Sequence, residues 1–450
     1  MSRITPEDGA KSAPGPEERS ATYREVLANG EYRTIFGASL LSWVGDYFAK
    51  AAITALVFAE TGSPALSAAA FALSYAPWLI AGPLLATLAE RYRYRTVMIT
   101  CDLVRMTLIA LVAVPGMPLW AMLTLLFLAS LASPPAQAAK SAMLPQILPG
   151  DQLTVGLALN LTSGQAAQVG GYLIGGLVAA VNPRGALAFD AATFALSALL
   201  LITWVQSRPP AGSTRRHLLR ETSDGFRLVF GTATLRSIAL VVFGASVFST
   251  VPEGLGAAWA AWLHPANAST QGVWQGLIMM ANPVGQVVGA LLLTRLFSPA
   301  RRRSLIIPFS LAVPAVLIPS LLEPRFAVVC LMAFATGFFV SGMVPTSNSL
   351  FVRVLPDGYR ARAFGVMQMG VQLTQGIGIF AAGLLADRIA LPLAVGVWSV
   401  LGLLVMICIA LAWPSRETFD QALAARSPAQ PPAQPAASPS PRAGALSQGA

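Results

Sequence analysis

Charged residues are scarce in this chain. Only 11% of its 450 residues are charged, whereas soluble domains carry about 25%. Hydrophobic residues make up 55% of the sequence. Because such a chain has too little polar surface to face water over most of its length, the composition predicts an integral membrane protein and argues against a soluble domain.

Cysteine, histidine and lysine are also rare, and their scarcity excludes several kinds of site. The three cysteines lie in three different apolar runs, so we expect no disulfide framework. Two histidines cannot build a metal site alone, and no metal or other cofactor is expected. None of Lys11, Lys50 and Lys140 follows a glycine, which a phosphate-binding loop requires. The sequence therefore indicates neither an ATP-driven pump nor an enzyme.

Twelve apolar runs follow a polar N-terminal stretch that lacks the features of a cleaved secretory signal. Each run is long enough to cross a hydrocarbon core of about 30 Å as a helix. We therefore expect an all-α membrane protein with twelve transmembrane helices in two pseudo-symmetric six-helix bundles. The expected segments are an N-terminal tail (1–33), a first bundle (34–205), a linker (206–236), a second bundle (237–413) and a disordered tail (414–450).

Arginine and lysine lie mainly on one side of the expected membrane. They gather in both tails and in alternate loops, while the loops of the opposite side hold only Arg184, Arg325 and Arg388. Loops rich in these residues stay in the cytoplasm. We therefore expect a multi-pass protein of a bacterial cytoplasmic (inner) membrane with both termini in the cytoplasm. The net charge of +10 then reflects topology, and no nucleic-acid partner is expected.

The two sets of runs resemble each other when the chain is shifted by 207 residues. The stretch Phe36–Ser39 then meets the identical stretch Phe243–Ser246. Pairs aligned by the same shift include Gln165 with Gln372, Gln168 with Gln375, Gly171 with Gly378 and Gly176 with Gly383. Matches at one offset in several runs indicate two homologous halves.

The loop after the second run places an acid within a basic cluster. It extends from Gly82 to Arg95 and includes Glu90 and Arg91. This stretch resembles the cytoplasmic loop signature of the major facilitator superfamily, with Glu90 in place of the usual aspartate. The resemblance implies that Glu90, Arg91 and Arg95 form a cytoplasmic gate through charge-assisted pairs. The alternative is a solvated basic loop that only obeys the positive-inside rule.

Two further stretches resemble exporter branches of that superfamily. Gly171–Gly176 is similar to an antiporter motif of the fifth span, with Tyr172 where a proline is usual. Asp190–Ala198 is similar to a segment of bacterial exporters related to the enterobactin and macrolide efflux proteins. The alternative for the glycines is close helix packing. For Asp190 the alternative is a place at the N-terminus of its helix.

Two carboxylates stand deep inside apolar runs at equivalent positions of the two halves. The 207-residue shift superposes Asp46 on Glu253. A carboxylate in hydrocarbon is costly and favours its protonated form, so both residues are candidates for proton coupling or substrate binding. Lys50 offers Asp46 a partner on the same helix face, whereas Glu253 has Ala257 at that spacing.

Other polar residues inside the runs are expected to pair or to face a central cavity. Asp102 and Arg105 lie three residues apart and form a candidate intramembrane ion pair. For the uncharged residues, hydrogen bonds between helices are the alternative to lining a cavity. The cavity candidates are Asn160, Gln165, Gln168, Asn282, Gln286, Gln372 and Gln375.

The resemblance implies a secondary transporter that works by alternating access between its two bundles, with the substrate near the membrane midplane. Together with the buried acids, it favours export of small hydrophobic or amphipathic molecules by proton antiport. The alternative is an importer or an uncoupled facilitator of a metabolite, because the same fold serves both. The expected partners are a small-molecule substrate, protons and the lipid bilayer, and the protein is expected to be a monomer.

Overall fold

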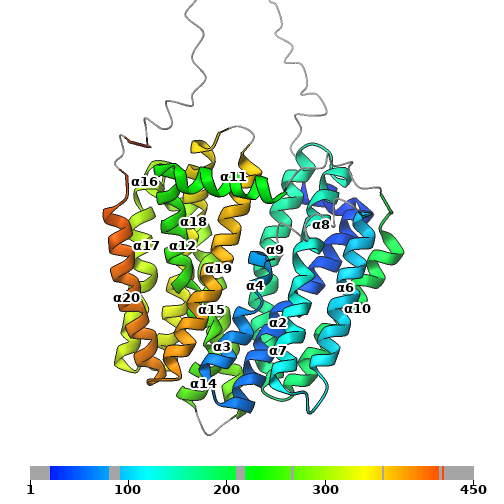
Figure 1. Cartoon of the computed structure of the whole chain (residues 1–450). Helices are drawn as coiled ribbons and strands as arrows, with labels where there is room; N and C mark the ends of the chain where they lie inside the picture. The colour runs from blue at the N-terminus through cyan, green and yellow to red at the C-terminus, as the bar shows by residue number, and fades with distance from the viewer. Residues whose placement is uncertain are drawn as a thin grey trace, which may run out of the picture.

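In the computed structural model helix is the only regular secondary structure among the described residues, which contain no strand. It describes residues 21–80, 92–208, 218–264, 268–356, 359–414 and 418–419. Figure 1 shows two groups of helices side by side. Helices α1, α11 and α16 lie at one end of the molecule, here called the linker end, and α14 lies at the opposite end, here called the far end.

The first group, here called the N half, is built from the helices that precede residue 205. They are α1 (Tyr23–Ala28), α2 (Gly30–Thr61), α3 (Pro64–Ala72), α4 (Ala76–Ile80), α6 (Tyr94–Val112), α7 (Leu119–Leu131), α8 (Ser133–Ile147), α9 (Asp151–Ala179) and α10 (Pro183–Trp204). The first span therefore begins earlier than expected, at Gly30, because the Asn29 side chain caps α2 by accepting from Glu31 N and Tyr32 N.

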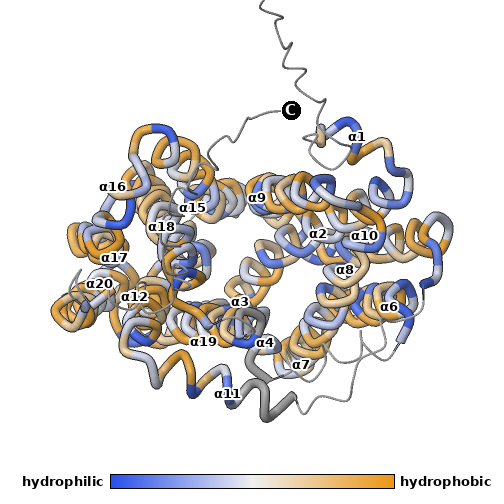
Figure 2. Tube along the Cα trace, turned by 90° about the horizontal axis from the view of Figure 1, so that it is seen from above, coloured by the Kyte–Doolittle hydropathy of each residue, from blue (hydrophilic) through white to orange (hydrophobic). Residues whose placement is uncertain are grey.

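The second group, here called the C half, follows a linker that contains α11 (Leu218–Gly231). In Figure 2, which views the molecule from the linker end, α11 runs along one side of the C half. The C half comprises α12 (Ala233–Ser249), α13 (Val251–Gly254), α14 (Gly256–Leu263), α15 (Ala268–Leu296), α16 (Pro299–Ser304), α17 (Ile306–Ala315), the 3-10 turn Ile318–Leu322, α18 (Phe326–Val354), α19 (Arg360–Ala386) and α20 (Leu391–Leu411). Nearly all of the expected disordered tail lies outside the described residues.

Eight helices of the described chain are long and apolar enough to cross a membrane. The other four expected spans coincide with α3 and α4, with α6, with α9 and with α17. The first and last of these are short or interrupted, α6 carries three charged residues and α9 is rich in polar side chains. The count of twelve therefore stays a prediction, while the all-helical membrane fold is confirmed.

The outer surface of the helices suits lipid. Large apolar side chains are exposed along α20, including Leu393, Leu401 and Leu404, which are 45%, 50% and 56% exposed. A soluble protein rarely exposes so continuous an apolar surface. Hydrocarbon chains are therefore the solvent that this surface fits.

The two halves meet through two related helix crossings near the far end. Helix α9 lies against α15, where a Cβ on Gly176 would come within 2.6 Å of the Gly272 carbonyl oxygen. Helix α19 lies against α3, where a Cβ on Gly383 would come within 3.1 Å of Ala65 Cα. The 207-residue shift relates Gly176 to Gly383 and Gly272 to Ala65. The same close crossing, which needs small residues, is therefore built twice.

Asp387 adds a polar link between the halves at the far end. Its carboxylate accepts hydrogen bonds from Ser63 Oγ at 2.7 Å and from the backbone N–H of Ala65 at 3.0 Å. Ser63 is the N-cap of α3, so the carboxylate of one half lies at a helix N-terminus of the other, where the helix dipole favours a negative charge. The far end of the interface is therefore closed.

Candidate functional site

Glu253 lies where the seventh expected span is interrupted. Helix α12 ends at Ser249, a single turn (α13) contains Glu253, and α14 begins at Gly256. Pro252 lacks a backbone N–H and so interrupts the helical hydrogen bonding at this point. Broken helices of this kind occur in transporters where the backbone lines a binding site. The break places Glu253 at the interface with the N half.

The Glu253 side chain is 1% exposed and incompletely paired. Its Oε2 accepts a hydrogen bond from the Tyr172 hydroxyl at 3.0 Å, across the interface from α9. Its Oε1 is buried without a hydrogen-bond partner. Lys50 of the N half lies close enough to act on the carboxylate by its charge, and the Gln168 side chain of the same half approaches the carboxylate as a hydrogen-bond donor. Glu253 is therefore a C-half acid whose polar surroundings come from the N half.

Lys50 does not form the ion pair with Asp46 that was the alternative to a functional role of Asp46. Its Nζ instead lies among three aromatic rings, 5.2 Å from the ring centre of Tyr47, 5.5 Å from that of Phe71 and 5.3 Å from that of Tyr75. Rings within about 6 Å of a cation attract it through their quadrupoles. The four-residue spacing on one helix suggested an ion pair that does not form, because Asp46 pairs with another residue.

Arg105 is that partner, so the predicted Asp102–Arg105 pair is wrong. The Arg105 guanidinium on α6 donates to Asp46 Oδ1 on α2, and its charge also stacks 4.1 Å from the centre of the Phe194 ring on α10. The pair links α2 to α6. A partner on a neighbouring helix therefore replaces the one available on the same helix, as buried charges in membranes often require.

The two other acids deep inside the N half, Asp102 and Asp190, both depend on α10. Asp102 accepts from Ser197 Oγ at 2.6 Å. Asp190 is 1% exposed and lies two turns inside α10, whose N-cap is Asn182. The helix-start interpretation of Asp190 is therefore wrong. A Cβ on Gly45 would lie 2.3 Å from Asp190 Oδ1, so the glycine of α2 makes room for this buried carboxylate.

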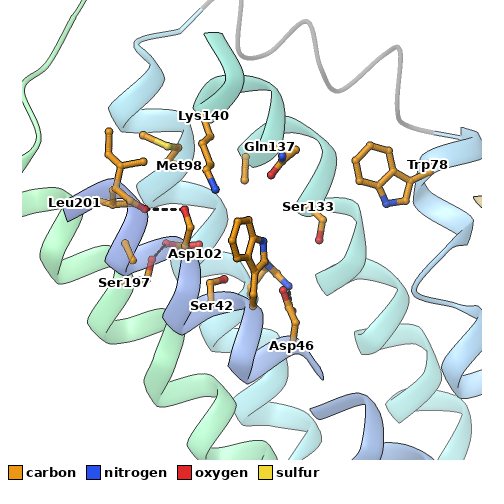
Figure 3. A pocket seen from close by; sticks show the side chains of 16 residues that line it. Ser42, Asp46, Trp78, Met98, Asp102, Ser133, Gln137, Lys140, Ser197 and Leu201 are labelled. Carbon is orange, nitrogen blue, oxygen red and sulfur yellow. Dashed lines mark hydrogen bonds and ion pairs between the residues drawn. The ribbon is translucent and has the colours of Figure 1, made fainter. Parts of the chain in front are cut away.

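These charges border a cavity of about 320 Å³ inside the N half, drawn in Figure 3. Asp46, Asp102 and Arg105 line it, as does Lys140 on α8. Lys140 is 7% exposed and its Nζ lies 4.0 Å from the centre of the Trp43 ring. In Figure 3 the Lys140 side chain extends into the space between the helices, towards Asp102. The cavity is therefore lined by both signs of charge.

Three of the predicted cavity residues form one network across the interface. Gln165 Nε2 lies 3.5 Å from Gln286 Oε1, which joins α9 to α15. Gln286 donates to Asn282 Oδ1 at 2.8 Å, and Asn282 donates to Ser249 O at 2.8 Å and to Thr336 Oγ1 at 2.9 Å. These residues therefore link helices at the interface by hydrogen bonds, which was the alternative to lining a cavity.

The other candidates are scattered. Gln372 lines an apolar cavity between α3, α7 and α19, and Gln375 is half-buried on α19. Asn160 is buried on α9 with neither amide atom hydrogen bonded. The structure does not describe Glu90 and Arg91. Arg95 donates to the carbonyl oxygens of Leu201 and Ile202 within its own half, so the gate role stays a prediction.

Two residues whose side chains form hydrogen bonds between the halves were not predicted from the sequence. Tyr172 was noted only as a departure from a proline-containing motif, yet its hydroxyl is the donor to Glu253. Gln275 is 2% exposed and donates across the interface to Ala51 O at 2.7 Å and to Thr54 Oγ1 at 2.9 Å. The sequence did contain an indication for Tyr172. A buried hydroxyl group in a motif of small residues requires a hydrogen-bond partner.

Two groups of helices related by an internal repeat, with an outer surface that suits lipid, are the architecture of many secondary transporters. The family model of the Major Facilitator Superfamily matches residues 35–263 and 263–446, so almost the whole chain outside its ends is covered. The chain therefore belongs to the Major Facilitator Superfamily, and it is a transporter and not an enzyme.

Two sequence relatives agree with this assignment. The chain is 23% identical to macrolide efflux protein A of Streptococcus pyogenes over 401 residues, which cover 85% of this chain and 95% of the relative. It is 25% identical to the MFS-type transporter YfiS of Bacillus subtilis strain 168 over 379 residues, which cover 80% of this chain and 88% of the relative.

Solved transporters share the fold. The nucleoside transporter NupG superposes with a TM-score of 0.71 at 14% identity, covering 86% of this chain and 99% of NupG. A bacterial homologue of the human lysosomal transporter Spinster, solved in an inward-facing and unoccupied conformation, superposes with a TM-score of 0.68 at 12% identity, covering 88% of this chain and 98% of its own. At these identities the likeness concerns the fold alone.

Proposed function

We propose that the protein exports small hydrophobic or amphipathic molecules by proton antiport. The observation that carries this proposal is Glu253, a buried acid at the interface of the halves with one oxygen unpartnered. Burial away from water favours the protonated form of a carboxylate, whereas hydrogen-bond donors, a nearby cation or water favour the ionised form. A group of this kind can take up a proton in one state of the transporter and release it in the other.

The position of Glu253 couples its proton to the movement of the halves. Its partner Tyr172 belongs to the N half, so the contact changes when one bundle rocks against the other. Protonation then changes the relative stability of the two states, because it alters a contact that only one of them contains. The site at Glu253 would bind a proton from the outside in one state and a substrate from the cytoplasm in the other.

The linker end is the cytoplasmic end in this proposal. Arg301, Arg302 and Arg303 of α16 gather there, as the positive-inside rule requires of cytoplasmic loops. The far end, closed by the two glycine crossings and by Asp387, then faces outward. The described conformation is accordingly inward-facing, in a bacterial cytoplasmic membrane, and the transporter works as a monomer with both termini inside.

Export is favoured over import by the efflux protein among the relatives. Macrolide efflux protein A aligns over 85% of this chain. The C half carries few charges within its spans, which suits an apolar or amphipathic substrate better than a highly polar one. An importer or uncoupled facilitator of a metabolite remains the alternative, because a nucleoside transporter shares the fold.

The test uses inside-out membrane vesicles, whose interior corresponds to the outside of the cell. A panel of labelled amphipathic compounds is added with and without an acidic interior. The proposal expects at least one compound to accumulate only when the interior is acidic, and to be lost when an ionophore collapses the gradient. Accumulation that ignores the gradient would favour a facilitator. Gradient-driven loss from preloaded vesicles would indicate an importer.

A further inference from the structure

An aromatic cage around Lys50 is a part of the interface that the proposed transport cycle does not use. Tyr47, Phe71 and Tyr75 surround Nζ at 5.2 to 5.5 Å from their ring centres. Tyr172 supports the cage edge-on, with its ring centre 5.2 Å from that of Tyr47. Aromatic cages of this geometry are the sites at which proteins bind ammonium groups.

The Glu253 carboxylate lies beside the cage, and one of its oxygens can still interact with a cation. Its Oε1 is buried and accepts no hydrogen bond of good geometry, although the Gln168 side chain approaches the carboxylate and Lys50 lies within electrostatic reach. Within the described part of the chain Lys50 forms no ion pair with Glu253 or with Asp46. Because Lys50 is tethered to α2, its ammonium reaches the rings without also reaching the free carboxylate oxygen. A cation that is free to move could reach both.

An apolar cavity adjoins the cage at Tyr75. It has a volume of about 570 Å³ and lies between α3, α7 and α19, so both halves contribute to it. Its walls include Ala72, Leu123, Phe127 and Ile377, and Tyr75 is shared with the cage. A volume of this size suits the body of a drug-sized molecule. The two regions together fit a ligand that has an apolar body and a cationic head.

We propose that Tyr47, Phe71, Tyr75 and Glu253 form a binding site for the organic ammonium group of an amphipathic ligand, and that Lys50 occupies this site when the ligand is absent. The ligand places its apolar body in the cavity beside Tyr75 and its ammonium in the cage, and the Lys50 ammonium leaves. Lys50 thus competes with the ligand ammonium for the cage, and its return displaces the ligand. That this ligand is the transported substrate rests on the proposed function, whereas its binding does not.

The experiment measures equilibrium binding to the purified full-length protein in detergent, where no gradient exists. The probe is tritiated benzyltrimethylammonium, and its uncharged isostere neopentylbenzene is the competitor. Lys50→Met should bind the probe about tenfold more tightly, because it keeps the side-chain length and removes the competing charge, and tenfold corresponds to about 1.4 kcal/mol. Lys50→Arg retains a cation and should keep the wild-type affinity. Neopentylbenzene should compete poorly in every variant.

The rings and the acid are tested in the Lys50→Met background. Tyr75→Leu should weaken binding about tenfold, while Tyr75→Phe, which keeps the ring, should not. Glu253→Gln should weaken binding of the charged probe and leave neopentylbenzene unaffected. Melting temperatures close to wild type verify that the variants fold. Equal or weaker binding in Lys50→Met than in wild type would overturn the proposal. Probe binding without any gradient-driven transport would refute the proposed function and leave this site intact.

Discussion

The N half and the C half are related by the 207-residue shift, yet they treat charge in opposite ways. Away from helix ends, the described spans of the N half contain Asp46, Lys50, Asp102, Arg105, Lys140 and Asp190. Those of the C half contain only Glu253. Asp46 corresponds to Glu253, and the positions equivalent to the other five N-half charges are apolar or small, such as Phe309 for Asp102 and Ser347 for Lys140.

This division separates acids that are paired within their own half from an acid that depends on the other half. In the N half, Arg105 neutralises Asp46, and Ser197 holds Asp102. In the C half, the single acid lacks a charged partner of its own half and depends on Tyr172 of the other. We expect the pairs within the N half to hold its helices together. The contact of Glu253 should instead change with the position of the N half. The four predictions that follow sharpen this comparison, from the largest expected effect to the smallest.

Removing the fixed pair should cost the most stability. Arg105→Gln leaves Asp46 without its partner in a cluster that also contains Asp190, and breaking a buried ion pair costs about 3 kcal/mol or more. The melting temperature of the purified protein should fall clearly. Asp46→Asn combined with Arg105→Gln should recover part of the loss, because no buried charge is then left alone. An unchanged melting temperature in Arg105→Gln would contradict the fixed network.

The glycine crossings should differ in their tolerance of a methyl group. In Gly176→Ala the new Cβ meets backbone atoms of α15 at 2.6 Å, and such overpacking costs about 1–3 kcal/mol. Because the crossing closes the far end, spin labels on the far ends of α2 and α14 should show longer distances. Gly383→Ala meets chiefly the Ala68 Cβ and should have a smaller effect. Gly170→Ala, which meets no atom within 4 Å, is the control.

Coupling between the halves at Glu253 should depend on the hydroxyl group of Tyr172. Tyr172→Phe removes the hydrogen bond to Glu253 and should lower the rate of gradient-driven transport up to about tenfold, or about 1.4 kcal/mol. Tyr47→Phe makes the same chemical change beside it and should have little effect, because no hydrogen bond of the Tyr47 hydroxyl is seen in the described residues. Similar rates in the two variants would remove Tyr172 from the coupling.

The polar link at the far end should contribute least. Asp387→Asn removes a charge from the N-terminus of α3, where such a charge is worth about 0.3–1 kcal/mol. The same spin-label distances should shift slightly towards an open far end, and added salt should reduce the difference. Glu60→Gln is the matched control, because Glu60 pairs with Arg184 inside the N half. A larger shift in the control would contradict the assigned role.

The sequence predicted the architecture better than the contacts. The 207-residue repeat indicated two halves, and it also relates the two glycine crossings, because small residues recur at the same positions. The depth of Glu253 in its run indicated a buried acid, which the structure places at the interface. Periodicity within one helix cannot show which helix lies next to it. The pairing of Asp46 with Arg105 was therefore missed in favour of the local partners Lys50 and Asp102.

The role of Glu253 is tested most directly by separating exchange from accumulation. Vesicles containing wild-type protein or Glu253→Gln are assayed for exchange of labelled against unlabelled substrate without a gradient, and for accumulation with an acidic interior. Glutamine keeps the shape but carries no exchangeable proton, so at a substrate concentration high enough to offset weaker binding the variant should exchange substrate and fail to accumulate it. Accumulation at the wild-type level, with its full dependence on the proton gradient, would contradict the assignment of Glu253 as the coupling acid.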